Sequence, residues 1–96
     1  MTDSDAGHDN AIEFITDQEL AALTGLNVRV VRRLTTLQVI EPAVSSPAPR
    51  FHRHTALRVR KMRRLHVELG VSWTSMPLVM QLLERIDQLE AHLRNR

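Results

Sequence analysis

The chain has 96 residues, of which 43% are hydrophobic and 3% aromatic, and it carries a formal net charge of +2. This length allows one small domain with an aliphatic core and excludes large multidomain enzymes. The sequence contains no cysteine, which excludes disulfides, thiol catalysis and cysteine-based metal sites. No apolar run approaches the ~20 residues that a bilayer span needs, and the acidic beginning is unlike a secretory signal, so we expect a cytoplasmic protein.

Charge is unevenly distributed along the chain. Residues 1–20 contain acids but no lysine or arginine, namely Asp3, Asp5, Asp9, Glu13, Asp17 and Glu19. Residues 28–64 contain a single acid, Glu41, and ten basic residues, namely Arg29, Arg32, Arg33, Arg50, Arg53, Arg58, Arg60, Lys61, Arg63 and Arg64. Such a middle segment can attract nucleic acid or an acidic protein surface. A solvated, arginine-rich surface without a ligand has the same composition.

Residues 1–11 are small, polar and acidic, and their composition predicts a disordered tail. Thr16 to Glu19 then form a capping box, in which the Thr16 hydroxyl and the Glu19 carboxylate each accept from the other residue's backbone N–H. Leu20 and Leu23 supply the apolar face of the helix that follows. Gly25 is expected to end this helix, because glycine tolerates a left-handed backbone.

A second helix is predicted over residues 28–37, with Asn27 as its N-cap. Helical spacing gathers four apolar residues on one side, namely Val30, Val31, Leu34 and Leu37. Arg29, Arg32 and Arg33 share the opposite side. Two helices joined by a tight glycine turn are typical of a helix-turn-helix, whose second helix can contact phosphates and enter a groove of DNA. The arginines also fit the wet face of an amphipathic helix, or basic character retained from a DNA-binding ancestor.

A small wing and a third helix are expected next. Residues 39–42 leave the second helix, residues 45–49 form a turn, and residues 50–53 form a short return strand, so the two flanks are expected to pair. Arg50 and Arg53 on this wing would clamp a nucleic-acid backbone. The third helix is predicted from about His54 to Leu69 and ends at Gly70. Its core face is expected to hold Val59, Met62, Leu65 and Leu69.

The last helix is predicted to begin near Ser75, since Pro77 is tolerated only in the first turn. Its apolar first half is expected to pack on the domain, and Trp73 to pack between the last two helices. Its second half keeps a narrow seam with coiled-coil spacing, formed by Leu82, Ile86, Leu89 and Leu93. This seam predicts a homodimer, and the alternative is that it folds back onto its own domain.

No catalytic set is evident in the sequence. A glycine-rich phosphate loop, a Ser/His/Asp order and paired carboxylates in an apolar setting are all absent, so we predict no enzymatic activity. His52 and His54 alternate on the predicted strand and can approach a ligand together, but they are expected to be surface or helix-entry residues. We therefore predict neither a metal ion nor a cofactor.

The order of elements resembles that of MerR-like regulators. Residues 25–42 are similar to the first two helices and following turn of those regulators, and residues 50–70 to their wing strand and third helix. Gln38 stands where those regulators usually have glycine. The resemblance implies an all-α fold, a MerR-like winged helix-turn-helix of four helices with a minimal two-stranded wing and a C-terminal coiled-coil helix. We divide the chain into a tail at 1–11, the winged domain at 12–74 and a helix for packing and dimerisation at 75–96.

A narrower resemblance, over residues 13–94, is to the chaperone-modulator family called CbpM. It depends mainly on residues 64–73, a leucine-rich basic helix with a linker carrying Trp73, and on residues 82–86, Leu-Leu-Glu-Arg-Ile. The resemblance implies a non-enzymatic protein that binds the J-domain of a DnaJ-like, curved-DNA-binding co-chaperone and blocks its stimulation of Hsp70. The alternative is a transcriptional regulator that binds DNA through Arg29, Arg32, Arg33, Arg50 and Arg53.

J-domains of this class present a basic helix, so an acidic face is expected to meet it. Two sets of acids are candidates for that contact. They are Asp17 and Glu19 on the first helix, and Glu84, Asp87 and Glu90 on the last.

Overall fold

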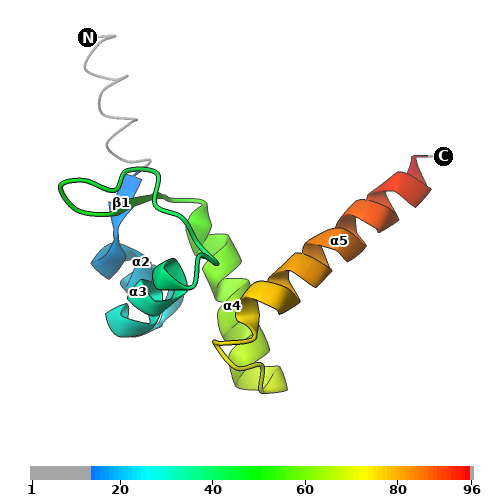
Figure 1. Ribbon diagram of the computed structural model, residues 1–96, viewed down its shortest axis with the longest axis horizontal. Helices are drawn as coiled ribbons and strands as arrows, with labels where there is room; N and C mark the ends of the chain where they lie inside the picture. Colours follow the sequence, from blue (N-terminus) through cyan, green and yellow to red (C-terminus); the bar gives the residue numbers. More distant parts are fainter. Residues whose placement is uncertain (1–13, 96) are drawn as a thin grey trace, which may run out of the picture.

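The computed structural model describes residues 14–95, which form four helices and a two-stranded antiparallel sheet. The elements in chain order are β1 (Phe14–Thr16), α2 (Asp17–Thr24), α3 (Val28–Thr36), β2 (Arg50–His52), α4 (Thr55–Leu69) and α5 (Met76–Arg94). Helix α2 packs on both α3 and α4, whereas α5 leaves the body on the far side of α4 (Figure 1). The predicted winged helix-turn-helix is confirmed, and the predicted tail at residues 1–11 lies outside the described residues.

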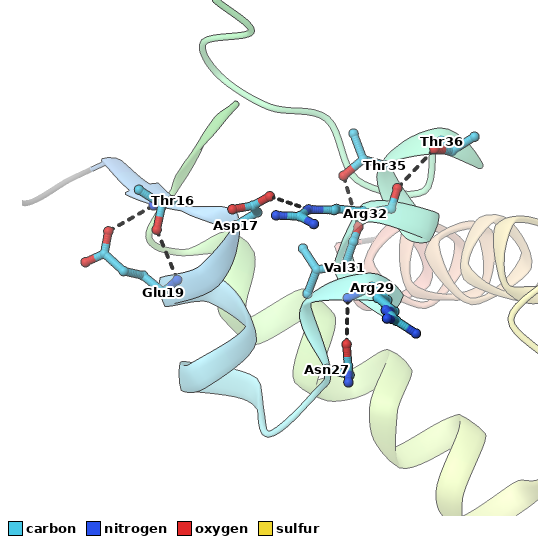
Figure 2. A network of polar contacts seen from close by, with 9 residues as sticks. All are labelled: Thr16, Asp17, Glu19, Asn27, Arg29, Val31, Arg32, Thr35 and Thr36. Atoms are coloured by element: carbon cyan, nitrogen blue, oxygen red, sulfur yellow. Dashed lines mark hydrogen bonds and ion pairs between the residues drawn. The ribbon is translucent and has the colours of Figure 1, made fainter. Parts of the chain in front are cut away.

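Local capping sets the bounds of α2. The backbone N–H of Glu19 donates to Thr16 Oγ1 at 3.1 Å, and the N–H of Thr16 donates to Glu19 Oε1 at 3.0 Å, which completes the predicted capping box (Figure 2). Gly25 ends the helix with φ 75°, and its N–H bonds the carbonyl of Ala21. Each end of this helix of 8 residues therefore has a local cap, and packing on α3 and α4 supplies the rest of its stability.

Helix α3 follows the turn with its predicted cap and its predicted faces. Asn27 Oδ1 accepts from the N–H of Arg29 at 2.8 Å. Val31 and Leu34 are buried, and the three arginines are exposed. The helix-turn-helix therefore forms as the hydrophobic spacing predicted.

Gln38 follows α3 in the left-handed backbone region, with φ 61°. Its N–H bonds the carbonyl of Thr35 at 3.0 Å, and the N–H of Val39 bonds that of Leu34 at 3.0 Å. These bonds require the left-handed conformation, which an L-residue with a Cβ adopts at a cost of roughly 1–2 kcal/mol. Gln38 therefore introduces backbone strain at a position suited to glycine.

The strand Arg50–His52 forms as expected, but its ladder partner is β1. The register is antiparallel and pairs Phe14 with His52, Ile15 with Phe51, and Thr16 with Arg50. The expected pairing of this strand with residues 39–42 is wrong. The segment before the strand contributes one β-bridge, between Val44 and Arg50. Prolines 42, 47 and 49 lack the N–H that a longer ladder needs on that side.

The core lies where the sheet, α2, α3 and α4 meet. Seven side chains are fully buried there, namely Phe51, Leu20, Leu34, Met62, Met76, Val31 and Val59. Val59 and Met62 confirm the predicted core face of α4. Leu69 does not belong to this face, because the last turn of α4 extends past the core and leaves its side chain 73% exposed.

Only the beginning of α5 contacts the core. Met76 and Met80 are buried and Leu83 is half-buried, while every residue from Glu84 to Asn95 except Ala91 is exposed. None of the helices within residues 14–95 is both long and apolar enough to cross a bilayer.

Replacement of Gln38 by glycine is expected to stabilise the protein. The relief of left-handed strain exceeds the extra chain entropy that glycine adds to the unfolded state, so the free energy of unfolding should rise by about 0.5–1 kcal/mol in urea denaturation. The matched control is Gln81→Gly, at an exposed position inside α5. This substitution should lower the free energy of unfolding by about 1 kcal/mol. A decrease for Gln38→Gly would contradict the strain at residue 38.

Loss of the N-cap hydroxyl in Thr16→Ala is expected to lower the free energy of unfolding by about 1 kcal/mol. The control is Thr36→Ala, since the hydroxyl of Thr36 bonds only the carbonyl of Arg32 within α3 and caps no helix. That change should alter stability by less than about 0.5 kcal/mol. Equal effects of the two substitutions in the same denaturation experiment would argue against the cap.

Candidate partner-binding surface

Two of the three α3 arginines are held by tertiary contacts. Arg32 Nε donates to Asp17 Oδ2 at 2.9 Å, which ties α3 to the first turn of α2 (Figure 2). Arg33 Nη2 donates to Thr74 Oγ1 at 3.1 Å and so ties α3 to the segment before α5. A nucleic-acid phosphate at either position would have to replace these contacts, which weakens the predicted DNA-binding set.

The two acids predicted as partner contacts on α2 also form contacts within the protein. The side chain of Asp17 is only 16% exposed and faces Arg32. Glu19 is exposed, and its hydrogen bonds with Thr16 hold the pKa of its carboxyl below the usual range. The positive charges of Arg53 and Arg50 lower this pKa further. The structure thus places Glu19 near the wing arginines instead of on a free acidic face.

The acids of α5 are exposed and pair weakly with α4. Glu84 Oε1 lies 2.8 Å from Arg58 Nη2, and Asp87 Oδ2 lies 3.9 Å from Lys61 Nζ. Glu90, one turn further on, is also exposed. Exposed ion pairs contribute about 0–1 kcal/mol, so a partner with basic groups can replace them at small cost. The structure therefore separates the predicted acids into an occupied pair on α2 and an accessible set on α5.

The apolar seam of α5 is also accessible. Leu82, Ile86, Leu89 and Leu93 are between 48% and 62% exposed, while Met76 and Met80 face the core. The seam lies on a different side of the helix from these methionines, and α5 points away from the body (Figure 1). The alternative in which the seam folds back onto its own domain is therefore wrong.

The linker between α4 and α5 holds the angle of this exposed helix. Trp73 stacks on His66 with ring centroids 4.2 Å apart, and His66 Nδ1 lies 2.6 Å from the carbonyl oxygen of Val71. Ser72 Oγ donates to Ser75 Oγ at 2.9 Å one residue before α5 begins. Trp73 is half-buried against the core, so the α4 side of its predicted packing between the last two helices is confirmed.

His52 and His54 lie together but do not form a metal cluster. Their rings stack with centroids 5.0 Å apart, and Phe14 lies on His52 at 5.1 Å. They border a cavity of about 480 Å³ lined by Gln38, Val39, Glu41, His52, His54, Thr55 and Arg58. Within the described part of the chain, no group of three or more histidine or acidic residues is suited to hold a metal ion.

Sequence reasoning missed one structural arginine. Arg60 donates from Nε and Nη2 to the carbonyl of Leu23, at 3.1 and 2.9 Å, and so caps the C-terminal end of α2. The sequence does show that the last turn of α2 has no basic residue of its own. Its final carbonyls therefore need a hydrogen-bond donor from elsewhere in the chain or from water. This donor could not be identified, because the two residues are 37 positions apart.

Comparison with known proteins agrees with this architecture. Residues 15–95 match the family described as "MerR HTH family regulatory protein". The chain is also 30% identical over 86 residues to the "Chaperone modulatory protein CbpM" of Citrobacter koseri, with 88% of this chain and 85% of the relative covered. The family match over residues 15–95 includes α5 as well as the helix-turn-helix. The chain therefore belongs to the MerR helix-turn-helix family and, within it, to the chaperone modulatory proteins of the CbpM type.

Proposed function

We propose that this protein is a non-enzymatic chaperone modulator that binds the J-domain of a DnaJ-like co-chaperone and inhibits its stimulation of Hsp70 in the cytoplasm. The observation that carries the proposal is the similarity to a chaperone modulatory protein over 88% of this chain and 85% of the relative. A helix-turn-helix alone would support only a regulatory family. The MerR family match covers residues 15–95 and so includes α5, the helix whose outer half the structure leaves accessible.

The acids of α5 are the favoured contact for the J-domain. Glu84, Asp87 and Glu90 are exposed on a helix that projects from the body (Figure 1). Of the three, only Glu90 borders the apolar seam on the helical wheel. Such a surface offers carboxylates to the basic helix that J-domains of this class present. Asp17 and Glu19 contribute less in this proposal, since the contacts with Arg32 and Thr16 would have to be released first.

The same helix supports a homodimer. In this proposal residues 12–74 act as the scaffold, while residues 75–96 pack on it and dimerise through Leu82, Ile86, Leu89 and Leu93. An exposed apolar seam with heptad spacing is stabilised when a second helix covers it. Glu84 and Asp87 lie on a side of α5 away from the seam, so they remain accessible in such a dimer.

DNA binding is the second candidate function. It is favoured by the helix-turn-helix itself and by the exposure of Arg29, Arg50 and Arg53 on α3 and the wing. The contacts of Arg32 and Arg33 with Asp17 and Thr74 reduce the number of arginines available to phosphates. This candidate therefore ranks below J-domain binding.

The full-length chain is expected to co-purify with the DnaJ-like protein of its own cell and to lower J-domain-stimulated ATPase activity of Hsp70. Charge reversal in the double variant Glu84→Lys, Asp87→Lys should weaken this association by about tenfold, because it opposes like charges. Glu41→Lys changes an exposed acid outside α5, serves as the control and should bind normally. Absence of J-domain binding, together with salt-sensitive, sequence-specific binding to duplex DNA, would favour the second candidate.

The homodimer is tested separately by sedimentation of the full chain at micromolar concentrations. Ile86→Asp places a charge in the middle of the seam and should convert the dimer to a monomer. Gln88→Asp adds the same charge on another side of α5 and should leave the dimer intact. If the unsubstituted chain sediments as a monomer, or if both variants behave alike, the seam does not form the interface.

A further inference from the structure

The solvent-facing side of α4 carries a stripe of apolar and basic residues that none of the functions above uses. Leu57, Arg60, Arg64 and Val67 are spaced by three, four and three residues, so they lie in one line along the helix. We call these four residues the α4 stripe. The opposite side of α4 packs into the core through Ala56, Val59 and Met62.

The apolar members of the stripe are unusually accessible for a helix that packs on a core. Leu57 is 68% exposed and Val67 is 64% exposed. A shallow groove of about 390 Å³ surrounds Leu57 and is lined by Arg60, Arg63 and Arg64. A second groove of about 240 Å³ lies on the other side of Arg64 and is lined by Lys61, Arg64, Leu65, Glu68 and Leu69. Arg64 thus borders both grooves.

The basic residues of α4 differ in what they already contact. Arg58 and Lys61 pair with acids of α5, and Arg60 bonds the carbonyl of Leu23. The guanidinium of Arg63 lies against the turn at Gly25. No carboxylate of residues 14–95 lies within ion-pair distance of Arg64, so its guanidinium is available to a partner next to exposed apolar side chains.

We propose that the α4 stripe is a docking site for an acidic amphipathic helix of another protein. The stripe repeats with the spacing of helix packing, so a partner helix lying along α4 can follow it from Leu57 to Val67. Apolar residues of that helix cover Leu57 and Val67, and its carboxylates accept paired hydrogen bonds from the guanidinium of Arg64. The stripe includes none of the acids of α5, although Lys61, which pairs with Asp87, lines the groove beside Arg64.

Nucleic acid fits the stripe less well than an acidic helix does. Phosphate contacts satisfy arginines, but the phosphate backbone has no apolar surface to cover an exposed leucine and valine. An acidic amphipathic helix supplies both kinds of contact at the same spacing. The apolar ends of the stripe therefore decide between the two classes of partner.

The probe is a synthetic amphipathic helix of about three heptads, with leucines at the outer contact positions and two glutamates at the central ones. Its binding to the full-length protein is followed by fluorescence anisotropy at low salt. Arg64→Glu and Leu57→Ser should each weaken binding by about tenfold. Arg85→Glu makes the same charge change at an exposed position of α5 and should have no effect. Circular dichroism establishes that each variant is folded.

A charge swap makes the test specific. A second peptide, with arginines in place of the two central glutamates, should bind the Arg64→Glu variant more tightly than the unsubstituted protein. Equal loss of binding in Arg64→Glu and Arg85→Glu, or displacement of the peptide by duplex DNA at lower concentration than by unlabelled peptide, would overturn the proposal. Peptide binding that occurs only after Asp3, Asp5 and Asp9 are replaced by asparagine would also overturn it, since the chain's own N-terminal segment would then occupy the stripe.

Discussion

The structure depends on the pairing of two three-residue strands that lie far apart in the sequence. Ile15 and Phe51 face one another in this ladder, and both are buried in the core. Strand β1 continues directly into α2, and β2 is followed within three residues by α4. One antiparallel register therefore brings the first turns of both helices together in space, while local capping sets the residue at which α2 begins.

Several charged side chains of this protein form contacts between its helices. Arg32 joins α3 to α2, Arg60 caps the end of α2, and Arg58 bridges α4 to α5. Each contact lies at the surface and contributes little by itself, but together they orient all four helices. The helix that would read a DNA groove in a helix-turn-helix is thus partly committed to intramolecular contacts, while α5 presents acids and leucines that the body does not cover.

Two helices consequently expose different surfaces to partners. The outer half of α5 combines an apolar seam with carboxylates, whereas the outer side of α4 combines Leu57 and Val67 with guanidinium groups. The stack of Trp73 on His66 holds the linker between these helices. The two surfaces carry opposite charge, so the partners proposed for them differ in charge as well.

The sequence alone determined the features that depend on near neighbours. The capping box at Thr16, the N-cap at Asn27 and the glycine stops at residues 25 and 70 involve partners within five positions, so the pattern of residues was enough to predict the helices. Only the tertiary structure decided that β2 pairs with β1, that Arg32 meets Asp17 and that Arg33 meets Thr74. These partners are up to 41 positions apart, and no local rule states which distant groups the folded chain brings together. The acids of α5 depend on both local and tertiary information. Their spacing could be taken from the sequence, but their accessibility depends on the direction in which α5 leaves the body.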